Sequence, residues 1–437
     1  MANIPTTAVV ATVPGAEPGN SRSLVIVTML FFMWGLLTSL NDVLIPHLKS
    51  IHTLNYVQAM LVQFCFFGAY FIVSIPAGAL IRRIGYQNGA VTGLIIAASG
   101  CALFYPAANS GYSLFLFAFF VLASGITILQ VAANPYVTLL GSPESASSRL
   151  TLTQAFNSLG TTVGPYFGSV LILSGGIVAS TAVGAPGDGA AQRVAEAATV
   201  QAPYLILAGL LLALGIVFAL AKLPHVEDSP GMTPPDDGTK RSILSYRNLV
   251  LGAIAIFLYV GGEVSIGSFL VSYMGEGSIA GLPAAVAGKY VSYYWGGAMV
   301  GRFIGFVVLS RVSPGRVLAF NACSAIGLLL VAILGHGAIA MWAILGVGLF
   351  NSIMFPTIFS MSLHKLGKLT GQGSGILCMA IVGGAIVPFM QGFLADRIGI
   401  QQSFFLPMAC YAFILFFGMK FASMYHTSAE AAATSNQ

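Results

Sequence analysis

Residues 249–273 read LVLGAIAIFLYVGGEVSIGSFLVSY, and Glu263 is the one Asp, Glu, Lys or Arg among them. About 20 apolar residues in a helix span the hydrocarbon core of a bilayer, so this stretch predicts a transmembrane helix. The whole chain of 437 residues is similar, with 57% hydrophobic and 7% charged residues, whereas soluble domains have about 25% charged residues. Because backbone polar groups in hydrocarbon must be satisfied internally, the sequence predicts an all-α membrane protein.

The chain contains twelve apolar runs of this kind, six before and six after a polar break. We therefore predict twelve transmembrane helices in two six-helix bundles. The runs cover 24–46, 57–81, 89–108, 112–140, 150–173 and 203–220 in the first half, and 249–273, 290–309, 317–334, 340–363, 371–394 and 404–422 in the second. The predicted parts are a tail at 1–23, a bundle at 24–222, a linker at 223–248, a bundle at 249–424 and a tail at 425–437.

Lysine and arginine gather on alternate sides of the predicted helices. If the N-terminus is cytoplasmic, thirteen fall on the inner side and four on the outer side, and Arg302 within a helix completes the total of 18. Cytoplasmic loops carry an excess of these residues, so the pattern predicts that both termini are cytoplasmic. The inner residues are Arg22, Arg82, Arg83, Arg149, Lys222, Lys240, Arg241, Arg247, Arg311, Arg316, Lys365, Lys368 and Lys420, and the outer ones are Lys49, Arg193, Lys289 and Arg397.

The two halves repeat several features in corresponding helices. A Gly-x4-Pro spacing occurs at 160–165 in the fifth run and at 383–388 in the eleventh, and an amide precedes a proline in the fourth and tenth runs. Such repeats are typical of transporters that hinge and bind substrate at bent helices. We therefore expect Gly383, Gly384 and Pro388 to have a structural or gating role, although kinks without a role are also common in membrane helices.

Apart from Lys420, which the charge pattern assigns to the inner end of the last span, three charged residues fall within the predicted spans: Asp42, Glu263 and Arg302. A charge at mid-helix is costly unless it is paired or hydrated, so such residues usually mark function. Since no histidine lies near mid-membrane, a proton-coupled cycle would have to use a carboxylate, and Asp42 and Glu263 are the candidates. The alternatives are an interfacial cap for Asp42 and a structural ion pair with Arg302 for Glu263, although Arg302 is expected nearer the cytoplasm.

Amide, hydroxyl and aromatic side chains recur at helical spacing in several runs, as a neutral polyol site requires. Aromatic rings can stack on the apolar face of such a ligand. Each polar residue alone could instead join two helices. The predicted substrate-binding residues are Trp34, Thr38, Asn41, Gln130, Asn134, Gln154, Asn157, Tyr294, Trp295 and Asn351.

Other functions find little support in the sequence. The basic residues form no stripe, which argues against nucleic acid, and there is no nucleotide-binding G-x-x-x-x-G-K-[ST] loop or H-E-x-x-H metal motif. Five cysteines lie within apolar runs without a CxxC pair, so neither a disulfide framework nor a metal site is expected. We expect no enzyme activity and no cofactor, with an ion gradient or simple facilitation as the driving force.

Four stretches resemble the fucose, galactose and glucose symporters of the major facilitator superfamily: LNDVLIP at 40–46, QVAANPYV at 130–137, LTQAFNSLG at 152–160 and FPTIFS at 355–360. The resemblance implies the major facilitator fold and a proton-linked role for Asp42. In the fucose pattern a glutamate stands where this chain has Gln130, so the chain is more similar to the glucose/galactose branch, whose members have glutamine there and an acidic residue at the Glu263 position.

The resemblance implies import of glucose or galactose by cation symport through alternating access, with H⁺ as the coupling ion and Na⁺ as the alternative. N-acetylglucosamine or fucose symport and a drug/proton exporter of the same fold remain open, as does an uncoupled facilitator. The expected partners are a small sugar and the lipid bilayer. The expected setting is the bacterial inner membrane, with the chain acting as a monomer.

Overall fold

The computed structural model describes residues 23–36, 56–110, 112–168, 201–221 and 242–423, which are almost entirely helical and contain no strand. Seven helices there are long and apolar enough to cross a membrane, and Phe64–Ala107 makes two crossings because it turns back at Gly85. The shorter apolar helices Ser23–Leu36 and Tyr204–Leu220, together with α4 and α9, complete the predicted twelve. The twelve-helix fold is thereby confirmed.

The N-terminal bundle is built around α2, which packs against α3 and α7. At Gly85 the backbone has φ 81° and ψ 167°, a conformation that glycine adopts without the steric cost of a Cβ. Gly85 therefore separates two spans that follow each other without a loop. The elements are Ser23–Leu36, α2 (Tyr56–Ser110), α3 (Tyr112–Leu139), η1 (Pro143–Ser145), α4 (Ala146–Gly168) and α7 (Gln201–Leu220).

The C-terminal bundle is built around α8, which packs against α12, α14 and α16. Its tenth and eleventh spans are interrupted, at 352–353 between α11 and α12 and at η5 between α13 and α14. The elements are η3 (Ile243–Ser245), α8 (Arg247–Gly275), α9 (Ala284–Leu309), α10 (Pro314–Leu334), α11 (Gly337–Asn351), α12 (Met354–Leu363), η4 (Gly367–Leu369), α13 (Thr370–Met379), η5 (Ala380–Val382), α14 (Gly383–Ile398), α15 (Ile400–Ser403) and α16 (Phe405–Lys420).

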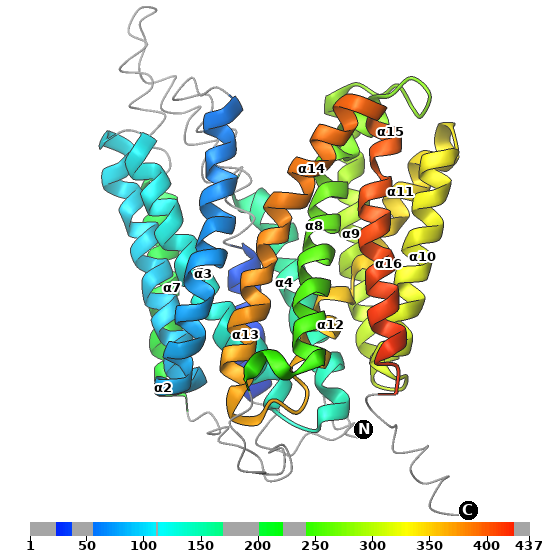
Figure 1. Cartoon of the computed structure of the whole chain (residues 1–437). Coiled ribbons are helices and arrows are strands. Elements are labelled where there is room, and N and C mark those ends of the chain that lie inside the picture. The colour runs from blue at the N-terminus through cyan, green and yellow to red at the C-terminus, as the bar shows by residue number, and fades with distance from the viewer. Residues whose placement is uncertain (1–22, 37–55, 111, 169–200, 222–241, 424–437) are drawn as a thin grey trace, which may run out of the picture.

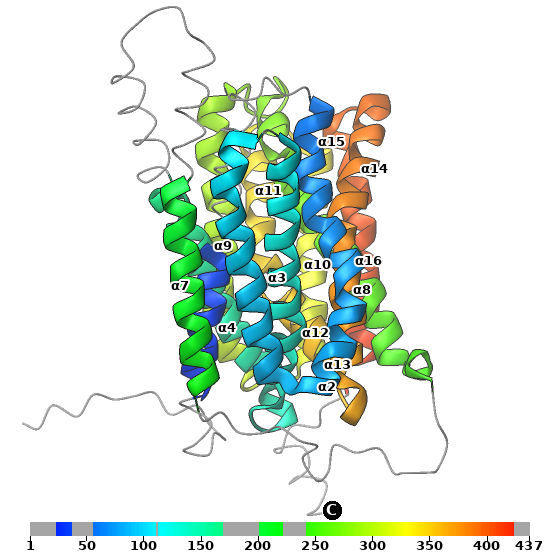
Figure 2. The ribbon, with the colours of Figure 1, turned by 90° about the vertical axis from the view of Figure 1, so that its left-hand side faces the viewer.

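The two bundles meet along a seam formed by α2 and α3 against α13, and by α4 against α9 and α12. We call the end that carries Arg82, Arg83, Lys365 and Lys368 the basic end; the positive-inside rule assigns it to the cytoplasm. The bundles are close together at this end and diverge toward the other end (Figure 1). A view at right angles shows the helices running side by side along a common axis (Figure 2).

Close backbone contacts hold the seam together at the basic end. A Cβ at Gly375 of α13 would lie 2.6 Å from the Ser74 carbonyl oxygen of α2, and one at Gly78 would lie 2.8 Å from the Gly371 oxygen. Ser147 and Ser360 share a hydrogen bond of 2.6 Å across the seam. Glycine and serine thus allow the bundles to approach as small residues do in membrane helix packing.

Arg149, which the charge pattern assigns to the inner side, is buried in the first turn of α4. Its guanidinium donates to the Val137, Thr138 and Ser142 carbonyl oxygens at 3.2, 2.8 and 3.1 Å. The last carbonyls of a helix have no intrahelical partner, so Arg149 caps α3 and holds the turn to α4.

Candidate functional site

The predicted substrate-binding residues in the described part of the chain lie within the spans, at different distances from the basic end. At 1.5 Å per residue, Gln130, Gln154 and Asn351 are about 12 to 18 Å from the basic-end termini of α3, α4 and α12. Tyr294 lies farther along α9, about 22 Å from its basic-end terminus. Gln130 and Gln154 thus lie at similar depth, while Asn351 and Tyr294 lie farther from the basic end.

Gln130 and Asn134 lie one turn apart on the buried face of α3. The Gln130 amide donates to the Tyr70 hydroxyl of α2, while Gln130 Oε1 and both polar atoms of Asn134 have no partner among the described residues. Buried polar groups are normally hydrogen-bonded. These atoms therefore have hydrogen-bonding capacity that a ligand hydroxyl or water could use.

Gln154 and Asn157 of α4 have different surroundings. Gln154 Nε2 is buried without a partner in the part of the chain that the structure describes, whereas Asn157 Nδ2 donates to the Phe31 carbonyl oxygen at 2.9 Å. Asn157 thereby joins α4 to the helix Ser23–Leu36, which also carries the buried Trp34. Of the two amides, Gln154 has the unused donor.

The tenth transmembrane helix is broken between α11 and α12. Pro356 has no N–H to donate to the Ser352 carbonyl oxygen, and Asn351 ends α11, where carbonyls lose their helical partners. Arg302 Nε donates to the Ser352 oxygen at 3.2 Å, and the Tyr259 hydroxyl lies 3.0 Å from the Asn351 oxygen. Side chains from α8 and α9 thus stabilise the break.

Glu263 lies at mid-span on α8, beside this break. Its Oε1 is 2.8 Å from the Tyr259 hydroxyl, one turn earlier on the same helix. Asn351 Nδ2 donates to the Tyr294 hydroxyl at 2.7 Å, and Tyr294 donates to the Glu263 carbonyl oxygen at 3.4 Å. Tyr294 is fully buried, so it takes part in this hydrogen-bond network and its ring face is not open for a ligand to stack on.

Arg302 connects the two bundles across the seam. Its Nη1 donates to the Gln154 carbonyl oxygen at 3.2 Å and to Ser158 Oγ. The predicted alternative of a direct Glu263–Arg302 ion pair is not what the structure shows, because the hydrogen bonds of Arg302 go to Ser352, Gln154 and Ser158. The two charges still interact electrostatically at longer range.

Trp295 of α9 is the more accessible aromatic candidate, with 45% of its surface exposed. Its ring meets Tyr294 edge-on, with centroids 5.0 Å apart. A Cβ at Gly267 of α8 would lie 3.1 Å from the indole, so the small residue lets the ring rest against α8.

The predicted gating residues of the eleventh span lie just beyond η5. A Cβ at Gly383 would lie 2.0 Å from the Phe257 carbonyl oxygen of α8, and one at Gly384 would lie 2.6 Å from the Phe67 ring of α2. Gly383 therefore allows packing within the C-terminal bundle, while Gly384 lies on the seam. Pro388 is partly buried within α14.

Three predicted site residues, Thr38, Asn41 and Asp42, lie outside the described residues, as does most of the predicted linker. Among the residues that are described, no group of three or more His, Cys, Asp or Glu could hold a metal ion. The five cysteines are free thiols.

Sequence reasoning did not identify Tyr259, Tyr70 and Ser158 as parts of the site. Tyr259 could have been found, because it precedes Glu263 by four residues and such pairs are neighbours on a helix. Tyr70 and Ser158 act through partners on other helices, and their contacts depend on the packing of the bundles.

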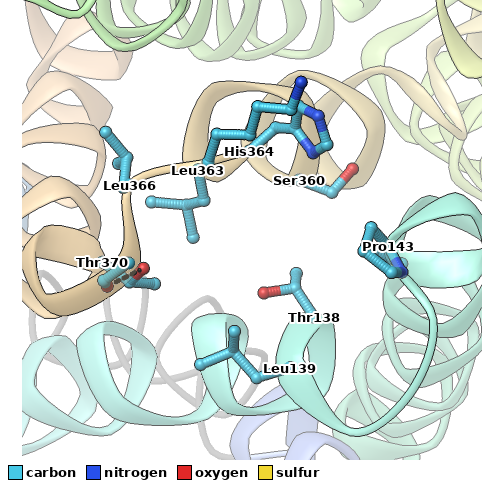
Figure 3. Close-up of a pocket in the computed structure, with 11 residues that line it drawn as sticks. Thr138, Leu139, Pro143, Ser360, Leu363, His364, Leu366 and Thr370 are labelled. Atoms are coloured by element: carbon cyan, nitrogen blue, oxygen red, sulfur yellow. Dashed lines mark hydrogen bonds between the residues drawn. The ribbon is translucent and has the colours of Figure 1, made fainter. Parts of the chain in front are cut away.

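A small pocket opens at the basic end of the seam (Figure 3). Thr138, Leu139 and Pro143 line it from the N-terminal bundle, and Ser360 and His364 are among the residues that face them from the C-terminal bundle. Burial, and then the charge of Lys365, lowers the pKa of His364 to about 4. The imidazole is therefore neutral near pH 7.

Comparisons with known proteins agree with this architecture. The sequence profile of the Major Facilitator Superfamily matches residues 25–388. A "Glucose/galactose transporter" of Brucella abortus biovar 1 (strain 9-941) is 57% identical over 95% of this chain and 98% of its own length. The "L-fucose-proton symporter" of Escherichia coli (strain K12) is 36% identical over 92% of this chain and 94% of its own length.

A solved structure shares the fold. The crystal structure of "a Major Facilitator Superfamily (MFS) transporter, FucP, in the outward conformation" superposes with a TM-score of 0.82 and 34% identity. The match covers 94% of this chain and all of that chain.

Proposed function

Because the chain belongs to the Major Facilitator Superfamily, a family of transporters rather than enzymes, we propose that it imports glucose or galactose by proton symport. The chain is a multi-pass membrane protein, and the names of two relatives, a glucose/galactose transporter and a fucose-proton symporter, support a sugar substrate and a proton as the coupled ion. We place it in the bacterial inner membrane, with both termini in the cytoplasm.

The unpartnered amides carry the substrate part of this proposal. Gln130, Asn134, Gln154 and Asn351 each have at least one buried polar atom without a partner in residues 23–36, 56–110, 112–168, 201–221 and 242–423. They come from three helices on both sides of the seam and lie about 8 to 18 Å along their spans from the basic-end helix termini; we call these four residues the amide layer. A neutral sugar binds through such convergent donors and acceptors, whereas a drug exporter needs a more apolar cavity.

Transport then follows from movement of the two bundles about the seam. The contacts across the seam, Ser147 to Ser360 near the basic end and Arg302 to Ser158 farther along α4, close the path on one side. Breaking them while the opposite end closes would expose the amide layer to the other side, as in alternating access. Asp42 and Glu263 are the proposed proton carriers.

Uptake by purified protein in proteoliposomes tests the proposal. An inward proton gradient should concentrate labelled glucose or galactose above the outside level, while a sodium gradient of equal size should not. Sugar entry that is independent of both gradients would exclude coupling. Accumulation driven by sodium would show that sodium, and not the proton, is the coupling ion. No uptake with either sugar, together with thermal stabilisation by fucose or N-acetylglucosamine, would reassign the substrate.

A separate variant tests the proposed coupling role of Asp42. Asp42→Asn should abolish proton-driven accumulation while leaving sugar exchange at equal concentrations, because a side chain that cannot release a proton still permits the loaded exchange step. Asp396→Asn, which changes an exposed carboxylate in the last turn of α14, is the matched control and should behave as the wild type. Normal uphill uptake by Asp42→Asn would exclude that role.

A further inference from the structure

Tyr259 lies between the Glu263 carboxylate and the break in the tenth span. Its hydroxyl is 2.8 Å from Glu263 Oε1 and 3.0 Å from the Asn351 carbonyl oxygen. When Glu263 is ionised, both neighbours are acceptors, but a tyrosine hydroxyl has one proton to donate. In that state Tyr259 can satisfy one of them at a time.

A proton on Glu263 removes this competition. The carboxyl O–H then donates to the Tyr259 oxygen, and Tyr259 donates to the Asn351 oxygen, so that all three groups have partners. When the proton leaves Glu263 for water, the carboxylate becomes the stronger acceptor, because hydrogen bonds to ionised groups are stronger than neutral ones. Tyr259 then donates to Glu263, and the Asn351 carbonyl loses its cap.

The Asn351 carbonyl belongs to the element that ties the bundles together. The next carbonyl, that of Ser352, accepts from Arg302, whose guanidinium also donates to Gln154 and Ser158 of α4. A change in the capping of this break is therefore transmitted to Arg302, which holds the two bundles together at the seam and lies next to the amide layer.

Resting on the proposed proton symport, we propose that Tyr259 is a positioning residue that converts the protonation state of Glu263 into a change at the helix break 351–353. The Glu263 proton stabilises the capped break, and its loss loosens the break. The structure thus places the link between proton and seam in one hydroxyl group.

Other titratable or charged groups surround Glu263. Among the described residues, those that interact electrostatically with Glu263 are Tyr259 on α8, Arg302 on α9, and Tyr294 and Tyr411 on α9 and α16. Of these, Tyr259 alone has its hydroxyl within hydrogen-bonding distance of both the Glu263 carboxylate and the Asn351 carbonyl oxygen at the break. This is why its removal should separate proton binding from the movement of the seam.

Tyr259→Phe tests the inference, because it removes the hydroxyl and keeps the ring. Proton-driven accumulation should fall about tenfold or more, the effect expected for a hydrogen bond to a charged group, and the pH profile of uptake should flatten. Sugar exchange at equal concentrations should persist, which a general loss of structure would not allow.

Tyr273→Phe is the matched control. Tyr273 is buried on the same helix and donates to the Ala332 carbonyl oxygen at 2.7 Å, so this variant also loses one buried cap. It should retain the wild-type pH profile. Glu263→Gln should reproduce the loss of accumulation, and the double variant Tyr259→Phe/Glu263→Gln should be no worse than either single variant if both act in one step.

Hydrogen exchange provides a readout that does not depend on whether Tyr259→Phe folds. In the wild type, the exchange rate of the amides around 350–354 should rise with pH by more than the exchange rate of the α10 amides does. Glu263→Gln should abolish this difference. A wild-type pH profile in Tyr259→Phe, or equal excess exchange in Glu263→Gln, would overturn the inference. Failure of the proposed function would instead appear as absent sugar uptake by the wild type.

Discussion

Buried polar side chains in this protein have two kinds of surroundings. Asn157, Arg149 and Tyr273 use their hydrogen bonds to join helices, whereas Asn134 and Gln154 retain buried atoms that no described residue contacts by a hydrogen bond. An unpaired buried polar group costs about 1–3 kcal/mol. The position of these amides beside the seam therefore supports their proposed role in binding a sugar.

His364 gives a prediction about pH at the residue scale. Because its pKa is lowered from 6.5 to about 4, the folded protein binds this proton less readily than the unfolded chain does. The stabilisation from neutral His364 is present above pH 6.5 and is lost as the pH falls toward 4. His364→Gln should therefore lose less thermal stability than the wild type between pH 7 and pH 5, as measured by melting temperature.

The same variant should leave the pH dependence of sugar uptake between pH 6 and pH 8 unchanged, because His364 remains neutral there. His336→Gln, which replaces an exposed histidine at the start of α11, is the control and should match the wild type in both measurements. A shifted uptake profile in His364→Gln would make this histidine part of the coupling.

At the scale of elements, the interrupted spans are the most informative feature. The tenth span breaks at 352–353 and the eleventh at η5, and both lie beside residues that cross the seam: Arg302 at the first and Gly384 at the second. A continuous helix would satisfy its own carbonyls and would need no such partners. The breaks thus couple the helices of one bundle to the surface of the other.

The close approach of α13 to α2 gives a prediction at this scale. Gly375→Leu would place a side chain against the Ser74 carbonyl oxygen, where even a Cβ would come within 2.6 Å. The basic end should therefore be forced apart, and uptake should fall about tenfold or more, since overpacking typically costs 1–3 kcal/mol. Spin labels at positions 83 and 368, in a background without native cysteines, should be farther apart in Gly375→Leu than in the labelled protein that keeps Gly375.

Gly327→Leu is the control for this change. Gly327 lies on the exposed face of α10, where a Cβ meets no atom within 4 Å. This variant should retain both uptake and the wild-type distance. An unchanged distance in Gly375→Leu would show that the α2–α13 contact does not hold the basic end closed.

At the scale of the whole molecule, the arrangement is two bundles closed at one end and apart at the other (Figure 1). Large apolar side chains such as Leu220, Ile339 and Phe389 are exposed on its surface. Such exposure would cause aggregation in water but suits contact with lipid tails, while the polar layer is enclosed between the bundles.

Orientation in the membrane is the prediction at this scale. Alkaline phosphatase fused after residue 437 should be inactive, because the charge pattern places the C-terminus in the cytoplasm. The same enzyme inserted within 174–201 should be active, since that stretch is predicted to be outside. The opposite result, an active C-terminal fusion and an inactive insertion, would show that the orientation is inverted and that the basic end lies outside the cell.

The sequence by itself determined the number of spans, their pairing into two halves and the acidic and amide residues of the candidate site. Long apolar runs require helices in lipid whatever their neighbours are, and the rare polar residues within them stand out because their burial is costly. The turn at Gly85 agrees with this prediction, since it divides the long helix α2 between the predicted runs 57–81 and 89–108.

Only the tertiary structure decided which polar groups are in contact. Glu263 and Arg302 are both charged residues within spans, yet Arg302 turns to Ser158, Gln154 and Ser352, and Glu263 is next to Tyr259. Partners on different helices depend on the rotation and crossing of those helices, which periodicity in one helix does not encode. The helical spacing of Tyr259 and Glu263 lay within reach of the sequence; the break that Tyr259 caps did not, because its carbonyls are brought to α8 by the packing of the bundle.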